Sequence, residues 1–176
     1  MYKRQAEGKL PAIAVSGPFG AVKEQSSGLY AQALAERGFL TIAFDPSYTG
    51  ESDGEPRYVA SPDINTEDFC AAVDFLSIRD DVDAERIGIL GICGWGGMAL
   101  NAAVIDTRIK ATVTVTMYDM SRVNANGYFD SMNADARYEL RKQLNAQRTE
   151  DARNGSYALA GGVVDPLPVD CLLYTS

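Results

Sequence analysis

The stretch RIGILGICGWGG, residues 86–97, decides how the rest of the chain is interpreted. Its first part, RIGILGI, is a short apolar run of the kind that forms a strand buried on both faces of a parallel sheet. Glycines at 94, 96 and 97 follow, and the small-residue segment GGMALNAAVI at 96–105 is expected to be a helix. Glycines at such a junction let strand and helix backbones approach closely. The stretch therefore predicts a buried strand that turns tightly into a helix.

Many hydrolases hold their nucleophile at the apex of such a turn, with small residues two positions before and after it. In one register Cys93 is the apex and its thiol is the nucleophile, but Trp95 then occupies a position that should be small. In the other register Trp95 is the apex, both flanking positions are small, and no nucleophile is present. Sterics favour the second register. It makes Trp95 an aromatic wall facing the substrate and Cys93 a packed strand residue with an unreactive thiol, although a thiol beside a helix N-terminus can also be reactive.

Apolar runs and helical stripes alternate along the rest of the first two thirds of the chain. Strands are expected near 12–16, 39–44, 87–92 and 111–116, side by side and parallel, with the turn at 93–97 at their carboxyl edge. Three helices lie between these strands in sequence, which predicts an α/β fold with a parallel sheet and helices on both faces. The first two helices should bury the stripes Leu29, Tyr30, Ala33, Leu34 and Phe69, Ala72, Val73, Leu76, the second one capped by Asn65 or Thr66.

Composition limits the classes of function. The chain has 176 residues, 46% of them hydrophobic, which suffices for a globular domain with a core. Its net charge of −8 offers no electrostatic footprint for nucleic acid or an anionic membrane, so a small-molecule substrate is the expected partner. Cys70, Cys93 and Cys171 lie far apart and the chain has no histidine, so free thiols are expected, with no metal site, no disulfide framework and no cofactor.

No apolar run is long enough to cross a membrane, and the amino terminus lacks the apolar core of a signal peptide. The sequence therefore slightly favours a cytoplasmic protein while leaving open a signal peptide upstream of Met1.

Two loops follow the first two expected strands. Asp45 begins the turn DPSYTGES, where its carboxylate can accept local backbone N–H groups and where Gly50 and Ser52 support the bend. Lys23 and Glu24 in VKEQ are expected to fix the preceding loop through charge pairing, without a direct role in chemistry.

The segments GPFGAVKEQSSGLYAQALAERGFLTIAFDPSYTGES (17–52) and LGICGWGG (90–97) are similar to α/β-hydrolases of the dienelactone-hydrolase-like branch. The similarity runs from about Leu10 to Asp119. It implies a three-layer, partial α/β-hydrolase fold that begins at the third strand of the family and ends soon after the sixth. Relatives of this type commonly carry Ser at the position that the second register gives to Trp95.

The resemblance also implies an oxyanion hole. The loop containing Pro18, Phe19 and Gly20 would supply one backbone N–H, and the residue after the nucleophile would supply the other. That residue is Gly94 if Cys93 is the apex and Gly96 if Trp95 is the apex; an ordinary strand-to-helix turn without chemistry is the alternative.

Asp119 lies just past the last expected strand, at the edge where ligands bind in open α/β sheets. It is a weak candidate for orienting a base or contacting substrate. Capping or solvation of the following loop is the more ordinary role for a carboxylate at this place.

Several features are expected of a truncated reading frame. The family's acid and histidine are absent, and the tail CLLYTS resembles translated adapter sequence. We expect a partial α/β-hydrolase core over 1–119, a lid-like helical excursion over 120–164, and a tail over 165–176 whose last residues are not native. A sheet cut on both sides would expose apolar edges and favour self-association.

Three functional hypotheses result. The first is a fragment of a hydrolase acting on ester or related acyl bonds of small molecules, inactive as truncated because a nucleophile without its base loses activation. The second is a non-catalytic α/β-hydrolase-like protein that binds small molecules, with Trp95 in the nucleophile position. A dinucleotide-binding protein is disfavoured because GICGWGG does not match GxGxxG.

Overall fold

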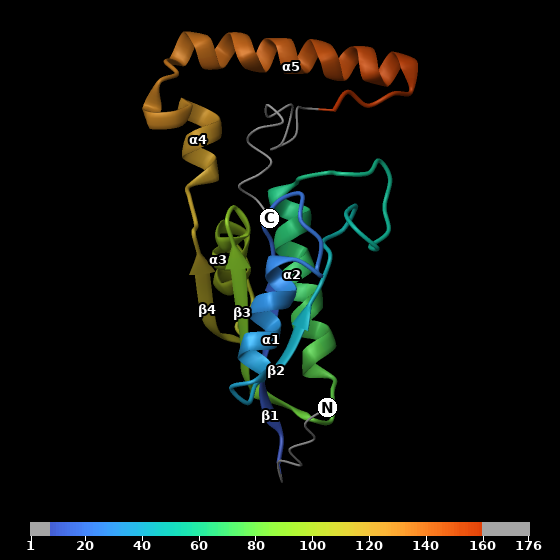
Figure 1. Ribbon diagram of the computed structural model, residues 1–176. Coiled ribbons are helices and arrows are strands. Elements are labelled where there is room, and N and C mark those ends of the chain that lie inside the picture. Colours follow the sequence, from blue (N-terminus) through green and yellow to red (C-terminus); the bar gives the residue numbers. More distant parts are fainter. Residues whose placement is uncertain (1–7, 160–176) are drawn as a thin grey trace, which may run out of the picture. The chain divides into compact units, whose positions relative to one another are not determined.

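The computed structural model describes residues 8–159. Within them, four strands form a parallel sheet in the order β2-β1-β3-β4, as Figure 1 shows. The strands are β1 (Leu10–Ser16), β2 (Leu40–Ala43), β3 (Val82–Ile92) and β4 (Ile109–Val115). Both the positions of the expected strands and their parallel adjacency are confirmed.

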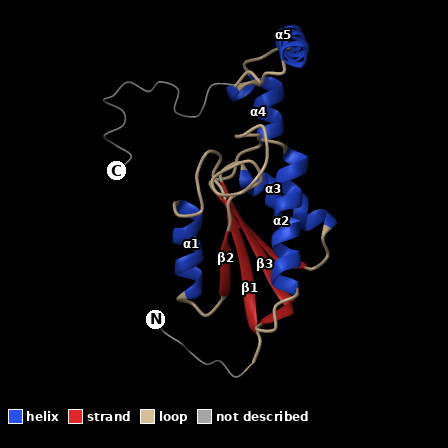
Figure 2. Ribbon diagram, turned by 90° about the vertical axis from the view of Figure 1, so that its right-hand side faces the viewer, coloured by secondary structure: helices blue, strands red, loops and turns tan. Residues whose placement is uncertain are grey.

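Helices cover both faces of the sheet, which confirms the expected layers. Figure 2 shows α1 (Ser26–Ala35) on one side and α2 (Pro62–Ser77) with α3 (Trp95–Ile105) on the other. Each side has its own apolar cluster. The α2 and α3 side is built mainly on Phe69, Leu76, Ile87, Ile89, Trp95 and Met98; the α1 side is built on Val15, Ala31, Leu90 and Ile92.

Helix α2 buries the predicted stripe but begins earlier than predicted. Its N-cap is Ser61, whose Oγ accepts a hydrogen bond from the N–H of Ile64, and Pro62 occupies the first helical position. Proline is favoured there because its missing N–H would have no helical partner. Asn65, expected as a cap, lies buried inside the helix, where its Oδ1 accepts from the N–H of Ser61 at 3.1 Å. The expectation of Asn65 or Thr66 as the N-cap was therefore wrong.

Helix α1 turns a slightly different face to the sheet than predicted. Leu29 is 67% exposed, so its place in the buried stripe was wrong. Ser27 and Ala31 are the buried residues of this helix, and Tyr30 and Leu34 pack against the α1-side cluster. The helix presents small residues to the sheet, and its larger apolar side chains lie at the margins of that contact.

The chain divides into two compact units after Ser121. The second unit contains most of α4 (Met120–Asn126) and the long helix α5 (Ala134–Asn154). Asn133 caps α5 by accepting from the N–H of Ala136 at 2.9 Å, and Gly155 ends it in the left-handed region. The lid role of 120–164 stays a prediction, and the 165–176 tail lies outside the described residues. No helix within residues 8–159 is both long and apolar enough to span a membrane.

Candidate active site

The turn between β3 and α3 has Cys93 at its apex. The strand ends at Ile92 and the helix begins at Trp95, and Cys93 has a φ of +61°. The N–H of Cys93 donates to the carbonyl of Val115 at 2.8 Å, and its own carbonyl accepts from the N–H of Gly96 at 3.0 Å. Other non-glycine residues in loops share a positive φ, so the dihedral alone does not single out Cys93. Its place between the buried strand β3 and the helix α3 distinguishes it from those residues.

Most glycines around this turn have to be glycine because atoms of neighbouring residues approach their Cα positions closely. A Cβ on Gly91, two residues before Cys93, would overlap the carbonyl oxygen of Trp95. A Cβ on Gly94 would lie 2.5 Å from the ring of Phe19, and one on Gly96 would lie 2.8 Å from Cγ of Met117. A Cβ on Gly97 would meet no atom within 4 Å. Gly91 and Gly97 are the two glycines that distinguish the registers, and of these only Gly91 has to be small, as expected when Cys93 is the apex.

Trp95 is not the apex residue, and its expected position there was wrong. Its side chain is 1% exposed, so it is also not an aromatic wall facing the substrate. Its indole packs against the rings of Phe19, Phe44 and Phe69, with centroids 6.0, 6.3 and 5.6 Å away. Its position is the first in α3, from which the side chain enters the core beside Gly17, where a Cβ would lie 2.8 Å from Cβ of Trp95. The core has room for a large ring at a position that sequence reasoning required to be small.

The loop after β1 lies against this turn. Gly17 has a φ of +100°, and a Cβ there would lie 2.5 Å from the carbonyl oxygen of Ile92. Phe19 packs over Gly94, so the structure brings together the two segments predicted to form an oxyanion hole. Pro18 has no N–H and accepts from the N–H of Ala21 at 3.2 Å.

Three N–H groups in the 18–20 loop and the turn after β3 have no hydrogen-bond acceptor within the described residues. Within residues 8–159, the N–H groups of Phe19, Gly20 and Gly94 donate none of the hydrogen bonds found outside helices and strands. They remain candidates to bind a developing oxyanion.

Asp119 is exposed and lies between the end of β4 at Val115 and the start of α4. Because β3 and β4 are adjacent and parallel, Asp119 and Cys93 follow strands that end at the same edge of the sheet. Its part in chemistry stays a prediction. In the described part of the chain, no three cysteine, aspartate or glutamate side chains gather closely enough to hold a metal ion.

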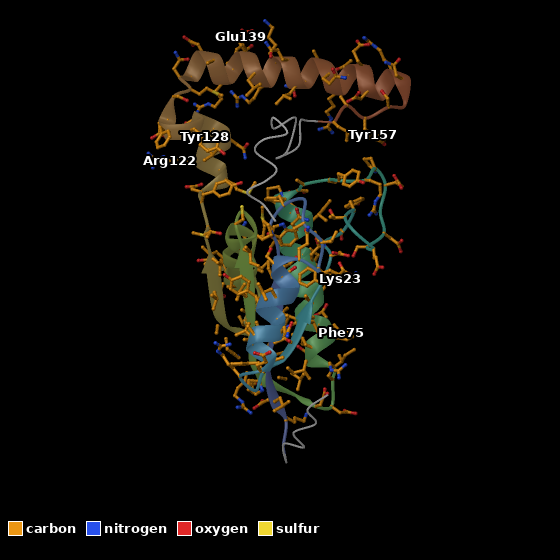
Figure 3. All side chains as sticks on the ribbon, in the orientation of Figure 1. Lys23, Phe75, Arg122, Tyr128, Glu139 and Tyr157 are labelled. Atoms are coloured by element: carbon orange, nitrogen blue, oxygen red, sulfur yellow. The ribbon has the colours of Figure 1, made fainter. Side chains whose placement is uncertain are left out.

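A buried carboxylate joins the loops that follow β1 and β2. Asp45 is 6% exposed and accepts from the N–H of Lys23 at 2.7 Å, from Lys23 Nζ at 3.1 Å and from the N–H of Glu51 at 3.0 Å. Lys23 Nζ also lies 3.0 Å from Glu24 and 2.6 Å from Glu51. Figure 3 labels Lys23 in this loop. The predicted backbone contacts of Asp45 and charge pairing of Lys23 are confirmed. Their direct contact was missed, because no local pattern links positions 22 residues apart.

These contacts shift the titration of both groups. Burial raises the pKa of Asp45, but hydrogen bonds from the N–H groups of Glu51 and Lys23 and from Lys23 Nζ outweigh it and hold the pKa below its usual value. Hydrogen bonds to Glu51, Glu24 and Asp45, in that order of effect, raise the pKa of Lys23. The pair is therefore ionised throughout the physiological range.

A hollow of about 440 Å³ lies between β2 and α2. Its apolar lining includes Phe44 and Phe75, the latter labelled in Figure 3, and its polar lining includes Asp45, Ser47 and Asp68. Cys93 is not among its lining residues. Sequence reasoning missed this hollow because its walls come from two segments separated in sequence.

Comparison with known proteins identifies the family. The model of the X-Pro dipeptidyl-peptidase (S15) family matches residues 4–161. The chain belongs to this family. It is 64% identical over 156 residues to the uncharacterized protein PA2218 of Pseudomonas aeruginosa, a match covering 89% of this chain and 42% of that protein. The crystal structure of PA2218 superposes with a TM-score of 0.89 at 58% identity, covering 98% of this chain and 54% of that chain.

Two further known proteins are similar to this S15-family chain. The thiohydrolase aneE of Aspergillus aculeatus is 35% identical over 115 residues, covering 65% of this chain and 36% of that protein. The α/β-hydrolase GrgF of a Penicillium species superposes with a TM-score of 0.74 at 23% identity, over 93% of this chain and 54% of that one. The expected α/β-hydrolase fold and a hydrolase family are thus confirmed. The narrower dienelactone-hydrolase-like branch stays a prediction. The chain spans less than half the length of these curated relatives.

Proposed function

We propose that this chain supplies the nucleophile of a hydrolase that cleaves ester or related acyl bonds of small molecules, and that Cys93 is that nucleophile. The observation that carries the proposal is the position of Cys93, half-buried at a positive φ between a buried strand and the first turn of α3. Non-glycine residues held in sparsely populated backbone regions cost about 1–3 kcal/mol and cluster at active sites. The S15 family and the thiohydrolase relative support an acyl-transfer reaction.

The proposed reaction has two steps. Sγ of Cys93, as thiolate, attacks the carbonyl carbon of the substrate; a C–S bond forms, the bond to the leaving oxygen or sulfur breaks, and the leaving group departs with its electron pair. Water then attacks the acyl-cysteine, releases the carboxylic acid and returns the cysteine.

The negative charge that develops on the carbonyl oxygen in the first step needs donors that are already in place. The N–H of Gly94 and the N–H of Phe19 or Gly20 are the groups we assign to it. Each fixed donor of this kind is worth roughly 100- to 1,000-fold in rate.

The general base is the part of the reaction that these residues do not supply. The 176 residues contain no histidine, so a histidine base would come from outside this sequence. With no base to activate water, we expect the chain alone to be acylated and then to release product slowly.

The test is acylation by p-nitrophenyl acetate of a variant that keeps Cys93 as its sole cysteine, made with Cys70→Ala and Cys171→Ser. We expect p-nitrophenolate in an amount equal to the chain, and an acetyl group on the peptide containing Cys93 by mass spectrometry. The folded chain should react at least ~10-fold faster than the same chain unfolded in urea, because only the folded turn presents the N–H donors.

The matched control keeps Cys70 as its sole cysteine instead, through Cys93→Ala and Cys171→Ser. Burial first, and then the nearby Asp106 and Glu67, raise the pKa of the Cys70 thiol, so it should be acylated slowly. Equal acylation of the two single-cysteine chains, or no gain on folding for Cys93, would show that Cys93 is an ordinary thiol.

A further inference from the structure

The contact between Lys23 and Asp45 lies at one end of the loop that faces Cys93. This loop leaves β1 at Ser16, passes Phe19 and reaches Lys23 just before α1. At its far end, the backbone N–H and Nζ of Lys23 both donate to Asp45, at 2.7 and 3.1 Å. One residue thus attaches the loop to the buried carboxylate through main chain and side chain together.

The other end of the loop is held against the nucleophile turn. A Cβ on Gly17 would lie 2.5 Å from the carbonyl oxygen of Ile92, and the ring of Phe19 lies over Gly94 and 6.0 Å from the ring of Trp95. The loop segment that contains Phe19 and Gly20, whose N–H groups have no acceptor within residues 8–159, therefore runs between two fixed points.

Burying the carboxylate of Asp45 is energetically unfavourable by itself. Its side chain is 3% exposed, whereas the side chain of Lys23 is 29% exposed and that of Glu51 is 85% exposed. A buried carboxylate is stable only when hydrogen bonds and a cation compensate its lost hydration. The turn after β2 is folded tightly onto it, since a Cβ on Gly50 would overlap the carboxylate. Removing Lys23 or the charge of Asp45 should thus loosen both loops at once.

We propose that Lys23 and Asp45 are positioning residues that set the distance between the N–H donors of the 18–20 loop and Sγ of Cys93. This inference rests on the proposed function, because it concerns the oxyanion site of that reaction. Lys23 and Asp45 touch no reacting atom in it; they act through the backbone of the loop. A displacement of about 1 Å in such a donor can cost roughly 100-fold in rate.

The experiment compares two reactions of Cys93 in the chain that keeps it as the sole cysteine. Acylation by p-nitrophenyl acetate passes through an oxyanion and needs the loop donors. Alkylation by iodoacetamide is a direct displacement with no oxyanion and needs only an accessible thiolate. For Lys23→Met and for Asp45→Asn, we expect acylation to slow by roughly 10- to 100-fold while alkylation is unchanged. Lys23→Arg should recover most of the acylation rate, since a guanidinium can also pair with the three carboxylates.

Controls separate positioning from loss of structure. Lys110→Met removes a lysine at the start of β4 and should leave both rates unchanged. Fluorescence of Trp95, the sole tryptophan of the chain, reports whether the packing beneath the turn is intact in each variant. The effects of Lys23→Met and Asp45→Asn should not add in the double variant, because both break the same contact.

The outcomes distinguish this inference from the proposed function. Unchanged acylation in both variants, or an equal fall in acylation and alkylation, would overturn the positioning role while leaving Cys93 as nucleophile. If the parent chain itself shows no acylation of Cys93 beyond its unfolded form, the proposed function fails, and this inference fails with it.

Discussion

Cys93 and Trp95 stand two positions apart in sequence but contact different halves of the core. Cys93 packs against the cluster on the α1 side, and Trp95 lies in the cluster on the α2 and α3 side. The positive φ of Cys93 turns the chain between them, so one side chain remains half-buried at the edge of the sheet while the other is 1% exposed. Trp95, which the steric argument placed at the apex, instead packs in the core beneath the turn.

Replacing Trp95 should destabilise the turn without creating a new catalyst. Trp95→Ser removes a buried indole from contact with Phe19, Phe44 and Phe69, and we expect a loss of about 3–5 kcal/mol in the free energy of unfolding. Urea denaturation measures this loss. If Trp95→Ser is as stable as the parent and gains esterase turnover, Trp95 occupied the nucleophile position after all.

The glycines of the turn offer a matched pair of substitutions. Gly91→Ala places a methyl group on the carbonyl of Trp95 and should cost about 3 kcal/mol or prevent folding. Gly97→Ala meets open space inside α3 and should stabilise the chain by about 0.5–1 kcal/mol, as alanine does in a helix. Thermal unfolding of the two variants tests the register directly, because an apex at Trp95 would require Gly97 to be small and would leave Gly91 replaceable.

At the scale of elements, the loops after β1 and β2 form one connected unit around Asp45. Ser52 Oγ donates to the carbonyl of Asp45 at 2.7 Å, and Ser16 Oγ donates to the carbonyl of Phe44 at 3.1 Å. The first contact closes the turn after β2, and the second ties the carboxyl ends of β1 and β2 to one another. Polar contacts therefore fix the loops at the carboxyl ends of β1 and β2. Packed aromatic rings around Trp95 fix the turn after β3.

This connected unit makes stability depend on pH in the acid range. The pKa of Asp45 is lower in the folded chain than its unfolded value of about 3.9, so the folded state binds fewer protons there and loses stability as pH falls below about 4. Asp45→Asn should cost about 2 kcal/mol at neutral pH and flatten this acid loss. The raised pKa of Lys23 acts in the opposite direction, and its contribution is lost only as pH rises above about 10.4 toward the folded pKa.

Urea denaturation at pH 3, 4, 5 and 7 measures the acid dependence, because these values bracket the ordinary carboxyl pKa of about 4. Asp81→Asn is the matched control: its pKa is lowered by the hydrogen bond from Arg79, but that pair is exposed and screened by solvent. If Asp81→Asn flattens the acid dependence as much as Asp45→Asn does, the buried contact of Asp45 contributes no more to it than an exposed ion pair.

At the scale of the whole molecule, the described sheet has two edges. Strand β2 pairs with β1 alone and β4 pairs with β3 alone within residues 8–159. On one face of β4, Ala111 is exposed and Val113 is 48% exposed. Exposed, flat, apolar edge strands favour association with other chains.

We expect the chain to associate at micromolar concentration and to be marginally stable. Val113→Lys should reduce association by placing a charge on the β4 edge, whereas Val104→Lys, an equally sized change at a site 84% exposed on α3, should not. Light scattering coupled to size exclusion compares the two variants. A monomeric parent with cooperative unfolding at these concentrations would remove the basis of the prediction.

Local patterns alone predicted the strands, the buried stripe of α2, the tight turn after β3 and the polar turn at Asp45. Each depends on periodicity or on glycine over a few neighbouring residues, and such signals survive in any tertiary arrangement. Only the folded structure decided that Cys93 is the apex, that Trp95 enters the core, and that Lys23 reaches Asp45. Those outcomes depend on where the sheet leaves space and on which loops meet at its edge. That information lies between segments distant in sequence, so no spacing within RIGILGICGWGG could supply it.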